Sequence, residues 1–190
     1  METIIKFEEQ LKEHKQIDAS QMLQLIHLTG MEKSLKTQYE NANNISARIR
    51  LHKDYSINKQ GWFPWIFEQS FSTMEQKNPL TILELGCGDG TLWKENFSKI
   101  PNHATIILSD ISEGMVRDAR RNIGDDTRFS YKVIDCKKIP YKSNAFDVIF
   151  ANHLLFYCDN IEQVCKEIHR ILKNDGIFLC TTYGTNHMKE

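Results

Sequence analysis

Three glycines at alternate positions, Gly86, Gly88 and Gly90, follow a short apolar run that ends at Leu85. Glycine adopts backbone conformations that other residues avoid, and it lets a ligand approach the main chain closely. A strand that passes through such a turn into a helix is the first unit of nucleotide-binding α/β domains. For these residues alone, a turn that serves structure only is the alternative. The spacing predicts a ligand-binding turn over residues 86–90.

The chemistry of this turn limits the ligand. Dinucleotide-binding turns read G-x-G-x-x-G and present a helix N-terminus to a pyrophosphate, whereas this turn reads G-x-G-x-G and contains Asp89. A carboxylate there would repel a pyrophosphate, so spacing and charge both argue against an NAD-linked dehydrogenase. A ligand without phosphate fits better. S-adenosylmethionine (SAM), with its adenosine, sulfonium and zwitterionic amino acid, is such a ligand.

A second acidic residue, Asp110, ends the next apolar run, ILSD. In Rossmann-like folds a carboxylate at the tip of the second strand binds ribose hydroxyls through charge-assisted hydrogen bonds. Capping of the following helix is the alternative, but Ser112 already supplies a cap for a helix that begins near Glu113. We therefore expect Asp110 to bind a ribose from an exposed strand tip.

The segments around these residues alternate between strand-like and helix-like patterns. Strands are expected at residues 81–85, 105–109, 131–135, 146–151 and 177–183, and helices at residues 112–122 and 161–173, the latter ended by Gly176. This alternation predicts an α/β fold, a Rossmann-like doubly wound parallel sheet with helices on both faces.

The chain ahead of this pattern has a different composition. Apolar residues at helical spacing predict several helices there, and Pro64 suits the first turn of a helix that carries Trp65 and Phe67. We expect residues 1–75 to form an N-terminal helical extension or cap and residues 76–190 to form the SAM-binding domain. Because the extension has no repeat and no low-complexity linker, it is expected to pack on the domain.

Composition excludes several functional classes. The 190 residues are 41% hydrophobic and 26% charged, which is typical of a globular protein. With 24 Lys and Arg against 25 Asp and Glu, the net charge is −1, so no global basic field favours nucleic acid. No apolar run reaches the roughly 18 residues that span a bilayer, and the charged N-terminus lacks a signal-peptide core. We expect a cytoplasmic protein without membrane or nucleic-acid partners.

The five cysteines give no sign of a metal site or a disulfide. They form no C-x-x-C pair, and four of them lie in or beside expected core elements. Buried thiols are therefore the expectation, and no metal is expected.

Taken in order, the motifs resemble the class I SAM-dependent methyltransferases that act on small molecules, with a type 11-like domain. The resemblance rests on ILELGCGDGTLW, LSDISEGMVRDAR, VIDCKKIPYKSNAFDVIFANHLLFYCDN and EIHRILKNDGIFLCTTYG, over roughly residues 78–184. It implies transfer of a methyl group from SAM to a small-molecule acceptor. It also implies cofactor-binding roles for Glu84, Gly86, Cys87, Gly88, Asp110, Ile111, Met115, Asp135, Cys136 and Asn152.

The resemblance also implies where these residues would lie around SAM. Ile111 and Met115 would line the adenine, Asp135 and Cys136 would border it at the tip of the third strand, and Asn152 would face the transferred methyl group. Core packing is the alternative for Met115, and an ordinary loop position is the alternative for Cys136 and Asn152.

The amino-acid part of SAM has its own candidate partners. The resemblance implies that the backbone of residues 86–88 touches it and that Glu84 helps to fix this loop. In the extension, Arg48 would hold the cofactor carboxylate as a bidentate pair, and Tyr39 would close over the cofactor. Packing is the alternative role for Tyr39.

Methyl transfer requires few catalytic side chains, because a sulfonium is already activated. Orientation is worth about 7–11 kcal/mol, and a general base adds about 10²–10⁴-fold. The catalytic residues are unknown from the sequence. His153, just past the fourth strand, is the first candidate base and His52 is the second, with surface or packing roles as the alternative for both.

A cluster of aromatic residues has two interpretations. Trp62, Phe63, Trp65 and Tyr55 would either form an acceptor pocket or anchor the extension to the sheet. The acceptor and the atom that is methylated cannot be predicted from the sequence.

The end of the chain departs from the family. Class I methyltransferases usually continue past the fifth strand with a helix and an antiparallel hairpin, and the chain ends too soon for them. The expected strand order is therefore 3-2-1-4-5, with the C-terminal hairpin absent and residues 177–183 at one edge. Such an apolar edge favours pairing, so a homodimer or cover by the extension is expected. A truncated chain, or a degenerate SAM-binding domain that acts as a regulatory or assembly partner, is the alternative.

Overall fold

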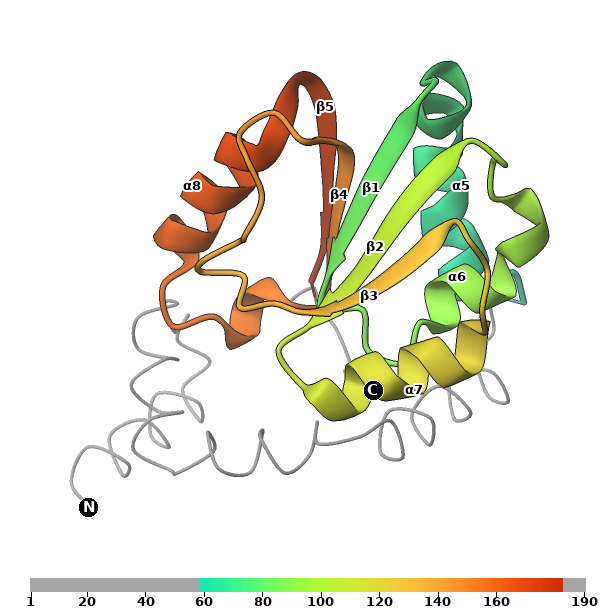
Figure 1. The fold of residues 1–190 in the computed structure, drawn as a ribbon, viewed down its shortest axis with the longest axis horizontal. Helices are drawn as coiled ribbons and strands as arrows, with labels where there is room; N and C mark the ends of the chain where they lie inside the picture. The colour runs from blue at the N-terminus through green and yellow to red at the C-terminus, as the bar shows by residue number, and fades with distance from the viewer. Residues whose placement is uncertain (1–58, 183–190) are drawn as a thin grey trace, which may run out of the picture. The chain divides into compact units, whose positions relative to one another are not determined.

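A computed structural model describes residues 59–182, apart from the side chains of residues 71–73, 75 and 76. The described residues belong to one compact unit, Glu40–Glu190. In chain order, their elements are α5 (Trp62–Gln76), β1 (Leu80–Leu85), α6 (Thr91–Glu95), the 3₁₀ helix η1 (Phe97–Lys99), β2 (Ala104–Asp110), α7 (Glu113–Ile123), β3 (Phe129–Val133), β4 (Phe146–Asn152), the 3₁₀ helix η2 (Leu155–Tyr157), α8 (Ile161–Ile171) and β5 (Leu172–Thr181), as Figure 1 shows.

The strands form one parallel sheet in the order β3-β2-β1-β4-β5. The central strand β1 pairs with β2 along its whole length, from Leu80 opposite Ala104 to Leu85 opposite Ser109. On its other side it pairs with β4. The α/β class and the strand order that the sequence predicted are thus confirmed.

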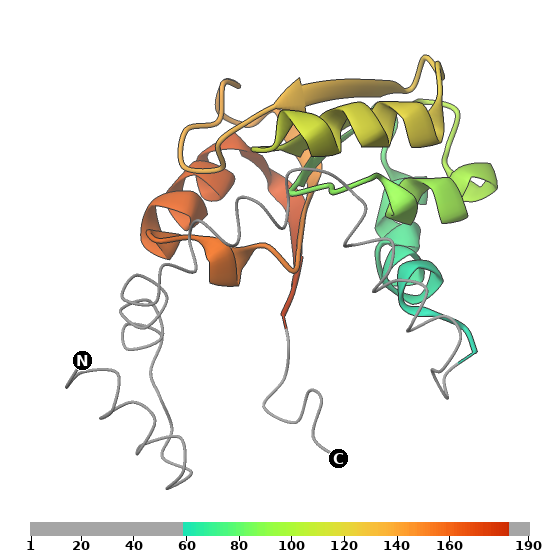
Figure 2. The same ribbon diagram turned by 90° about the horizontal axis from the view of Figure 1, so that it is seen from below.

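Helices cover both faces of the sheet (Figures 1 and 2). Leu80 and Ile82 of β1 belong to the core cluster that includes α5, α6 and α7, whereas Leu83 and Leu85 belong to the cluster that includes α8. Successive residues of a strand point to opposite faces. Because both faces are covered, β1 reads as a continuous apolar run rather than as an alternating one.

Trp93 of α6 lies at the centre of the first of these clusters and is fully buried. Three rings meet it edge-on, with centroid distances of 6.1 Å to Phe67, 6.1 Å to Phe129 and 5.6 Å to Phe150. Since Phe67 comes from α5, this helix of the expected extension contributes directly to the core of the sheet domain.

Two segment boundaries differ from the sequence prediction. The third strand is Phe129–Val133, two residues earlier than expected, so Asp135 lies in the following loop. Helix α8 ends at Ile171 and the chain enters β5 at once, so Gly176 lies inside a strand and not at a helix end. The pairing of β4 with β5 shifts register over this stretch, an irregularity that residue patterns do not reveal.

The cysteine prediction is correct in part. Cys87 and Cys158 are buried and Cys136 is half-buried, but Cys165 and Cys180 are exposed. Within residues 59–182 no cluster of side chains could hold a metal ion. None of the helices in the described part of the chain has the length and apolar character that crossing a bilayer requires.

Candidate functional site at the carboxyl end of the sheet

The glycine loop, residues 86–90, leaves β1 at the carboxyl end of the sheet and leads into α6. All three glycines have positive φ, +69° at Gly86, +55° at Gly88 and +74° at Gly90. Residues with a Cβ are strained in this region of backbone space. The backbone therefore favours glycine at each position, for the reason that the sequence suggested.

One backbone hydrogen bond and one side chain hold the glycine loop in place. The amide of Cys87 donates to the carbonyl of Ser109 on β2 at 2.8 Å. Asp89 Oδ1 accepts hydrogen bonds from the backbone N of Thr91 at 3.1 Å and from its hydroxyl at 2.6 Å, at the start of α6. Asp89 thus satisfies a donor of the first helical turn in addition to placing negative charge in the loop.

Gly86 also needs to be small. A Cβ built on it would lie 3.1 Å from Cδ1 of Leu154, in the loop after β4. We expect Gly86→Ala to lower the melting temperature by about 4 °C, since left-handed backbone costs a residue with a Cβ about 1–2 kcal/mol. It should also weaken S-adenosylhomocysteine binding about tenfold, because the loop moves; calorimetric titration and thermal melting measure both effects.

Gly124→Ala is the matched control for Gly86→Ala. Gly124 has a φ of +89° but nothing lies within 4 Å of its added Cβ, and it is at the far end of α7. This variant should lose stability without losing affinity. Equal losses of affinity in the two variants would refute a local role for Gly86.

Asp110 ends β2 and faces the glycine loop. Its Oδ2 accepts from the backbone N of Gly88 at 3.2 Å, and its Oδ1 accepts from the backbone N of Ser112 at 2.9 Å. Burial raises the pKa of Asp110, and these hydrogen bonds act in the opposite direction. The expectation of an exposed strand tip is wrong, because the carboxylate is half-buried and ties the loop to β2.

Glu84, the penultimate residue of β1, is another carboxylate at this end of the sheet, beside Asp110 and Asp89. It is 3% exposed, and its Oε2 accepts a 2.6 Å hydrogen bond from the indole N–H of Trp93. Burial raises the pKa of Glu84 to about 7. Asn152, at the end of β4, faces the same carboxylate and lowers its pKa, although its buried Nδ2 does not reach a full hydrogen bond with a described residue.

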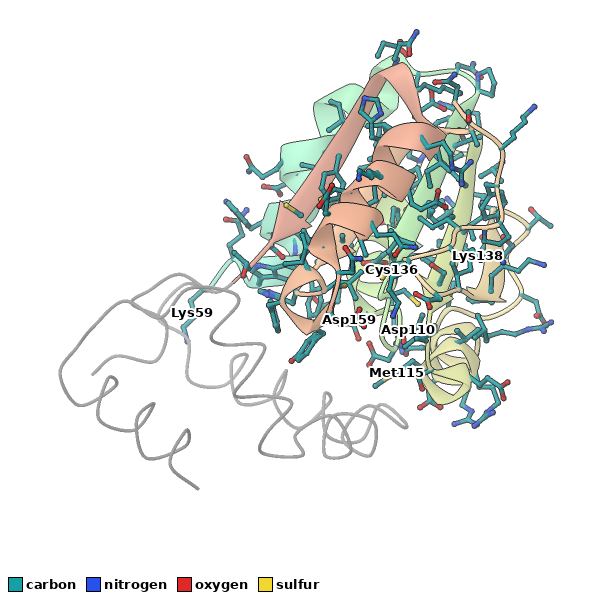
Figure 3. The ribbon with its side chains drawn as sticks, turned by 90° about the vertical axis from the view of Figure 1, so that its left-hand side faces the viewer. Lys59, Asp110, Met115, Cys136, Lys138 and Asp159 are labelled. Atoms are coloured by element: carbon teal, nitrogen blue, oxygen red, sulfur yellow. The ribbon has the colours of Figure 1, made fainter. Side chains whose placement is uncertain are left out.

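Figure 3 labels two of the residues expected around the adenine, Met115 and Cys136, at the same end of the sheet as Asp110. Ile111 is 71% exposed, an apolar side chain open to solvent, whereas Met115 is 1% exposed. The burial of Met115 favours the core-packing alternative for its side chain. Asp135 Oδ1 accepts from the backbone N of Lys137 at 2.9 Å, so it shapes the turn after β3.

Two neighbouring contacts join the loop after β3 to the segment after η2. The Sγ atoms of Cys136 and Cys158 lie 3.7 Å apart. Next to them, Lys137 Nζ lies 3.2 Å from a carboxylate oxygen of Asp159. Cys136 is thus positioned by a contact across the site that the sequence did not reveal.

His153, the first candidate base, lies directly after β4 with a φ of +51°. Its backbone N donates to the carbonyl of Thr181 at 3.0 Å. Its ring lies 4.9 Å from that of Trp62, which also meets Phe63 edge-on at 5.0 Å. Trp62 and Phe63 pack against the core, which supports the anchoring interpretation for these two, and Trp65 is 42% exposed.

Four candidates lie outside the described residues: His52, Tyr39, Arg48 and Tyr55. Their roles stay predictions.

Among the described residues, the sequence interpretation missed three with direct contacts in the site: Trp93 on Glu84, Leu154 over Gly86, and Thr181, whose hydroxyl lies 3.3 Å from Asn152 Oδ1. Trp93 is the third residue of α6, in its first turn, and its type gave no signal beyond core packing.

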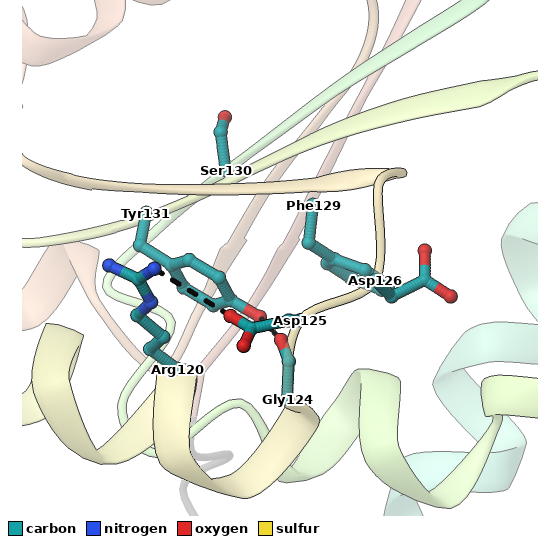
Figure 4. A pocket seen from close by; sticks show the side chains of 7 residues that line it. All are labelled: Arg120, Gly124, Asp125, Asp126, Phe129, Ser130 and Tyr131. Atoms are coloured by element: carbon teal, nitrogen blue, oxygen red, sulfur yellow. Dashed lines mark hydrogen bonds and ion pairs between the residues drawn. The ribbon is translucent and has the colours of Figure 1, made fainter.

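A separate pocket of about 230 Å³ lies at the opposite, amino end of β3 (Figure 4). Arg120, Asp125 and Tyr131 line it, and Arg120 pairs with Asp125 at 3.6 Å. Since ligands of open α/β sheets bind outside the carboxyl ends of the strands, this pocket is not the candidate site.

The residues at the carboxyl end fit SAM. A Cβ at Gly86 would occupy space beside Leu154, the buried Nδ2 of Asn152 has unused hydrogen-bonding capacity, and two carboxylates flank the glycine loop. A cationic sulfonium and an ammonium suit this negative end of the sheet better than a phosphate does. Ribose hydroxyls suit the carboxylate of Asp110.

Comparison with known proteins agrees with this geometry. A malonyl-[acyl-carrier protein] O-methyltransferase of Legionella pneumophila is 33% identical over 112 residues, which are 59% of this chain and 39% of that protein. The sterol 4-C-methyltransferase strm-1 of Caenorhabditis elegans is 32% identical over 108 residues, 56% of this chain and 32% of that protein. The chain thus spans about two-fifths of the length of these curated relatives, or less.

Solved structures share the fold, and a family match covers most of the sheet domain. A candidate S-adenosyl-L-methionine-dependent methyltransferase from Methanococcus maripaludis superposes with a TM-score of 0.59 at 22% identity, over 74% of this chain and 63% of that one. At this identity the likeness concerns the fold alone. Residues 83–180, more than half of the chain, match the family described as Methyltransferase domain, and the chain belongs to that family.

Proposed function

We propose that this chain is a SAM-dependent methyltransferase that methylates a small-molecule acceptor. One observation carries the proposal: Asp110 accepts a hydrogen bond from Gly88 N, so the second-strand carboxylate and the glycine loop form one preassembled unit. Membership of the methyltransferase family and the carboxylate of Glu84 on the other side of the loop support it.

Each part of the site has a task in this proposal. Asp110 binds the ribose hydroxyls, the glycine loop leaves room for the amino-acid part, and Ile111 offers an exposed apolar surface for the adenine. When bound, SAM supplies a methyl group on a sulfonium, and S-adenosylhomocysteine remains after transfer. The protein's contribution is to orient the acceptor in line with that methyl group and to exclude water.

The acceptor decides whether a base is needed. A carboxylate acceptor is already deprotonated, whereas a hydroxyl must lose a proton during transfer. His153 is the candidate base among the described residues, and its ring lies tilted against that of Trp62, next to the end of β4. Since the Legionella relative is named for O-methylation of a malonyl-acyl-carrier protein, malonyl-acyl-carrier protein is the first acceptor to test.

The test of the proposal is calorimetric titration of the full chain with SAM and with S-adenosylhomocysteine, followed by methyl transfer to malonyl-acyl-carrier protein and to other small acids. Micromolar binding of both ligands is expected. A folded chain that binds neither would refute the proposal. Binding without transfer to any acceptor would favour the non-catalytic SAM-binding alternative.

The quaternary structure is a separate prediction. The expected homodimer through β5 finds no support in the described residues or in the comparisons, and it stays a prediction, as does the cytoplasmic location. Sedimentation of the full chain tests the dimer directly.

A further inference from the structure

Trp93 combines two properties that core residues rarely share. Its ring is fully buried among Phe67, Phe129 and Phe150, so it has no path to a ligand. Yet its indole N–H leaves this apolar cluster and donates to Glu84 Oε2 at 2.6 Å. A buried tryptophan N–H needs an acceptor, and here the acceptor belongs to the candidate cofactor site.

Opposing effects of burial, neighbouring charges and hydrogen bonds set the pKa of Glu84. Its pKa is raised to about 7, mainly by burial and to a smaller extent by the negative charges of Asp110 and Asp89. Trp93 and Asn152 are the groups that lower the pKa, and Trp93 has the larger effect. The neighbouring thiol of Cys87 stays neutral and adds no negative charge, because burial raises its pKa well above its ordinary value.

The position of Glu84 indicates what this charge is for. Glu84 directly precedes Leu85, the last residue of β1 before the glycine loop. It lies on the face of β1 that α6 covers. Leaving a carboxylate at 3% exposure without a cation is costly. In the function proposed above, the ammonium group of the amino-acid part of SAM is the group that would supply the opposite charge.

We propose that Trp93 is a positioning residue for cofactor binding: its indole N–H orients the Glu84 carboxylate and keeps it charged, so that the carboxylate receives the ammonium group of SAM. Trp93 itself touches no ligand in this proposal. The inference rests on the proposed function and assigns an electrostatic role to a residue that otherwise belongs to the core.

The test compares two ligands that differ in the amino acid. S-adenosylhomocysteine carries the ammonium, whereas 5′-methylthioadenosine keeps the adenosine and sulfur and lacks the amino acid. We expect Trp93→Phe to weaken S-adenosylhomocysteine binding about tenfold at pH 7, since losing a hydrogen bond to a charged group shifts a pKa by about one unit or more. The affinity for 5′-methylthioadenosine should not change.

The pH profile separates charge from packing. Without the N–H donor the pKa of Glu84 rises from its value of about 7, so more of the carboxyl group is protonated at neutral pH. The affinity of Trp93→Phe for S-adenosylhomocysteine should therefore recover between about pH 7 and 8.5, as the carboxyl group ionises. A merely structural role would leave the deficit independent of pH.

Three variants control this experiment. Phe67→Leu loosens the same cluster without touching Glu84, and it should leave the affinities for both ligands unchanged. Glu84→Gln removes the charge, so Trp93→Phe should have no further effect in that background. Site-specific replacement of Trp93 by β-(3-benzothienyl)alanine keeps the ring shape, removes the N–H and preserves the fold if the phenylalanine variant is unstable.

The possible failures are distinguishable. Wild-type protein that binds neither ligand refutes the proposed function and this inference together. Wild-type protein that binds S-adenosylhomocysteine, with equal affinity in the benzothienyl variant, refutes the inference alone. An equal loss for both ligands in Trp93→Phe would also overturn it, because that outcome means general damage to the site.

Discussion

Replacing Asp110 by alanine is expected to weaken S-adenosylhomocysteine binding by at least about 100-fold. Two charge-assisted hydrogen bonds to ribose hydroxyls are worth about 1.5–3 kcal/mol each, and each 1.4 kcal/mol is a factor of about ten in affinity. The side chain also holds Gly88 N and Ser112 N. The substitution therefore loosens the glycine loop as well, and calorimetric titration measures the sum of both effects.

Asp110→Asn separates the ribose contact from the loop contacts. Its amide oxygen still accepts a backbone hydrogen bond, but the charge is lost, so an intermediate affinity is expected. Asp125→Ala, which removes a 91% exposed carboxylate that pairs with Arg120 beyond the far end of α7, is the matched control and should bind as the wild type does. If Asp110→Ala keeps affinity within threefold of wild type, the ribose assignment is incorrect.

Replacing Asp147 by alanine is expected to have the largest effect on stability. Asp147 lies near the start of β4, 3% exposed, where its Oδ2 accepts from Thr81 N at 2.9 Å, from the Thr81 hydroxyl at 2.6 Å and from Lys173 Nζ at 2.8 Å. Removing one partner of a buried ion pair costs about 3–5 kcal/mol. Because Lys173 is partly exposed, we expect about 3 kcal/mol, or a fall of about 6–12 °C in melting temperature.

The pH dependence of this effect follows from the pKa of Asp147. Burial alone would raise it, but hydrogen bonds from Lys173 and Thr81 outweigh burial and lower it below its ordinary value of 3.8. The carboxylate therefore stabilises the folded state fully above the unfolded pKa, and this contribution is lost as the pH falls through the folded pKa. The difference between wild type and variant should be full at pH 7 and should shrink in acid below about pH 4.

Asp175→Ala is the control for this prediction. Asp175 also forms an ion pair, with Lys77, but its side chain is 75% exposed, and such pairs contribute little. Its melting temperature should stay within about 2 °C of wild type. Binding of S-adenosylhomocysteine should be unchanged in Asp147→Ala below its melting transition, because Thr81 and Asp147 lie at the amino end of the sheet. Equal melting temperatures for Asp147→Ala and Asp175→Ala would contradict the stabilising role assigned to the buried carboxylate of Asp147.

Local pattern was sufficient for most strands and helices and for several residues at their ends, but not for the start of β3 or the boundary between α8 and β5. The glycine loop could be predicted because positive φ at Gly86, Gly88 and Gly90 restricts residue type directly. The parallel sheet followed from strands that alternate with helices, since parallel strands need crossovers, whereas the strand order followed from the resemblance to class I methyltransferases. Ser112 was found as the cap of α7, where its hydroxyl accepts from Met115 N at 3.2 Å, because capping depends on neighbours in the chain.

Contacts between distant segments could not be predicted in this way. The start of β5 at Leu172 depends on its pairing with Phe146, and no nearby residue signals it. The approach of Cys136 to Cys158 joins two loops whose path only the folded sheet determines. Asp147 is a single acidic residue in an apolar strand, and its partners Thr81 and Lys173 come from the two neighbouring strands, which local pattern does not reveal.

By itself, the sequence determined the fold class, the glycine loop and the two acidic residues at the carboxyl ends of β1 and β2, because each is a property of residue type and spacing along one segment. The tertiary structure decided how those residues are held and charged. Glu84 meets the indole N–H of Trp93 only because α6 folds back on the sheet, and Asp110 meets Gly88 only because β2 lies beside β1. Burial and hydrogen bonding then set the pKa of each carboxyl group, and both arise from packing across the sheet.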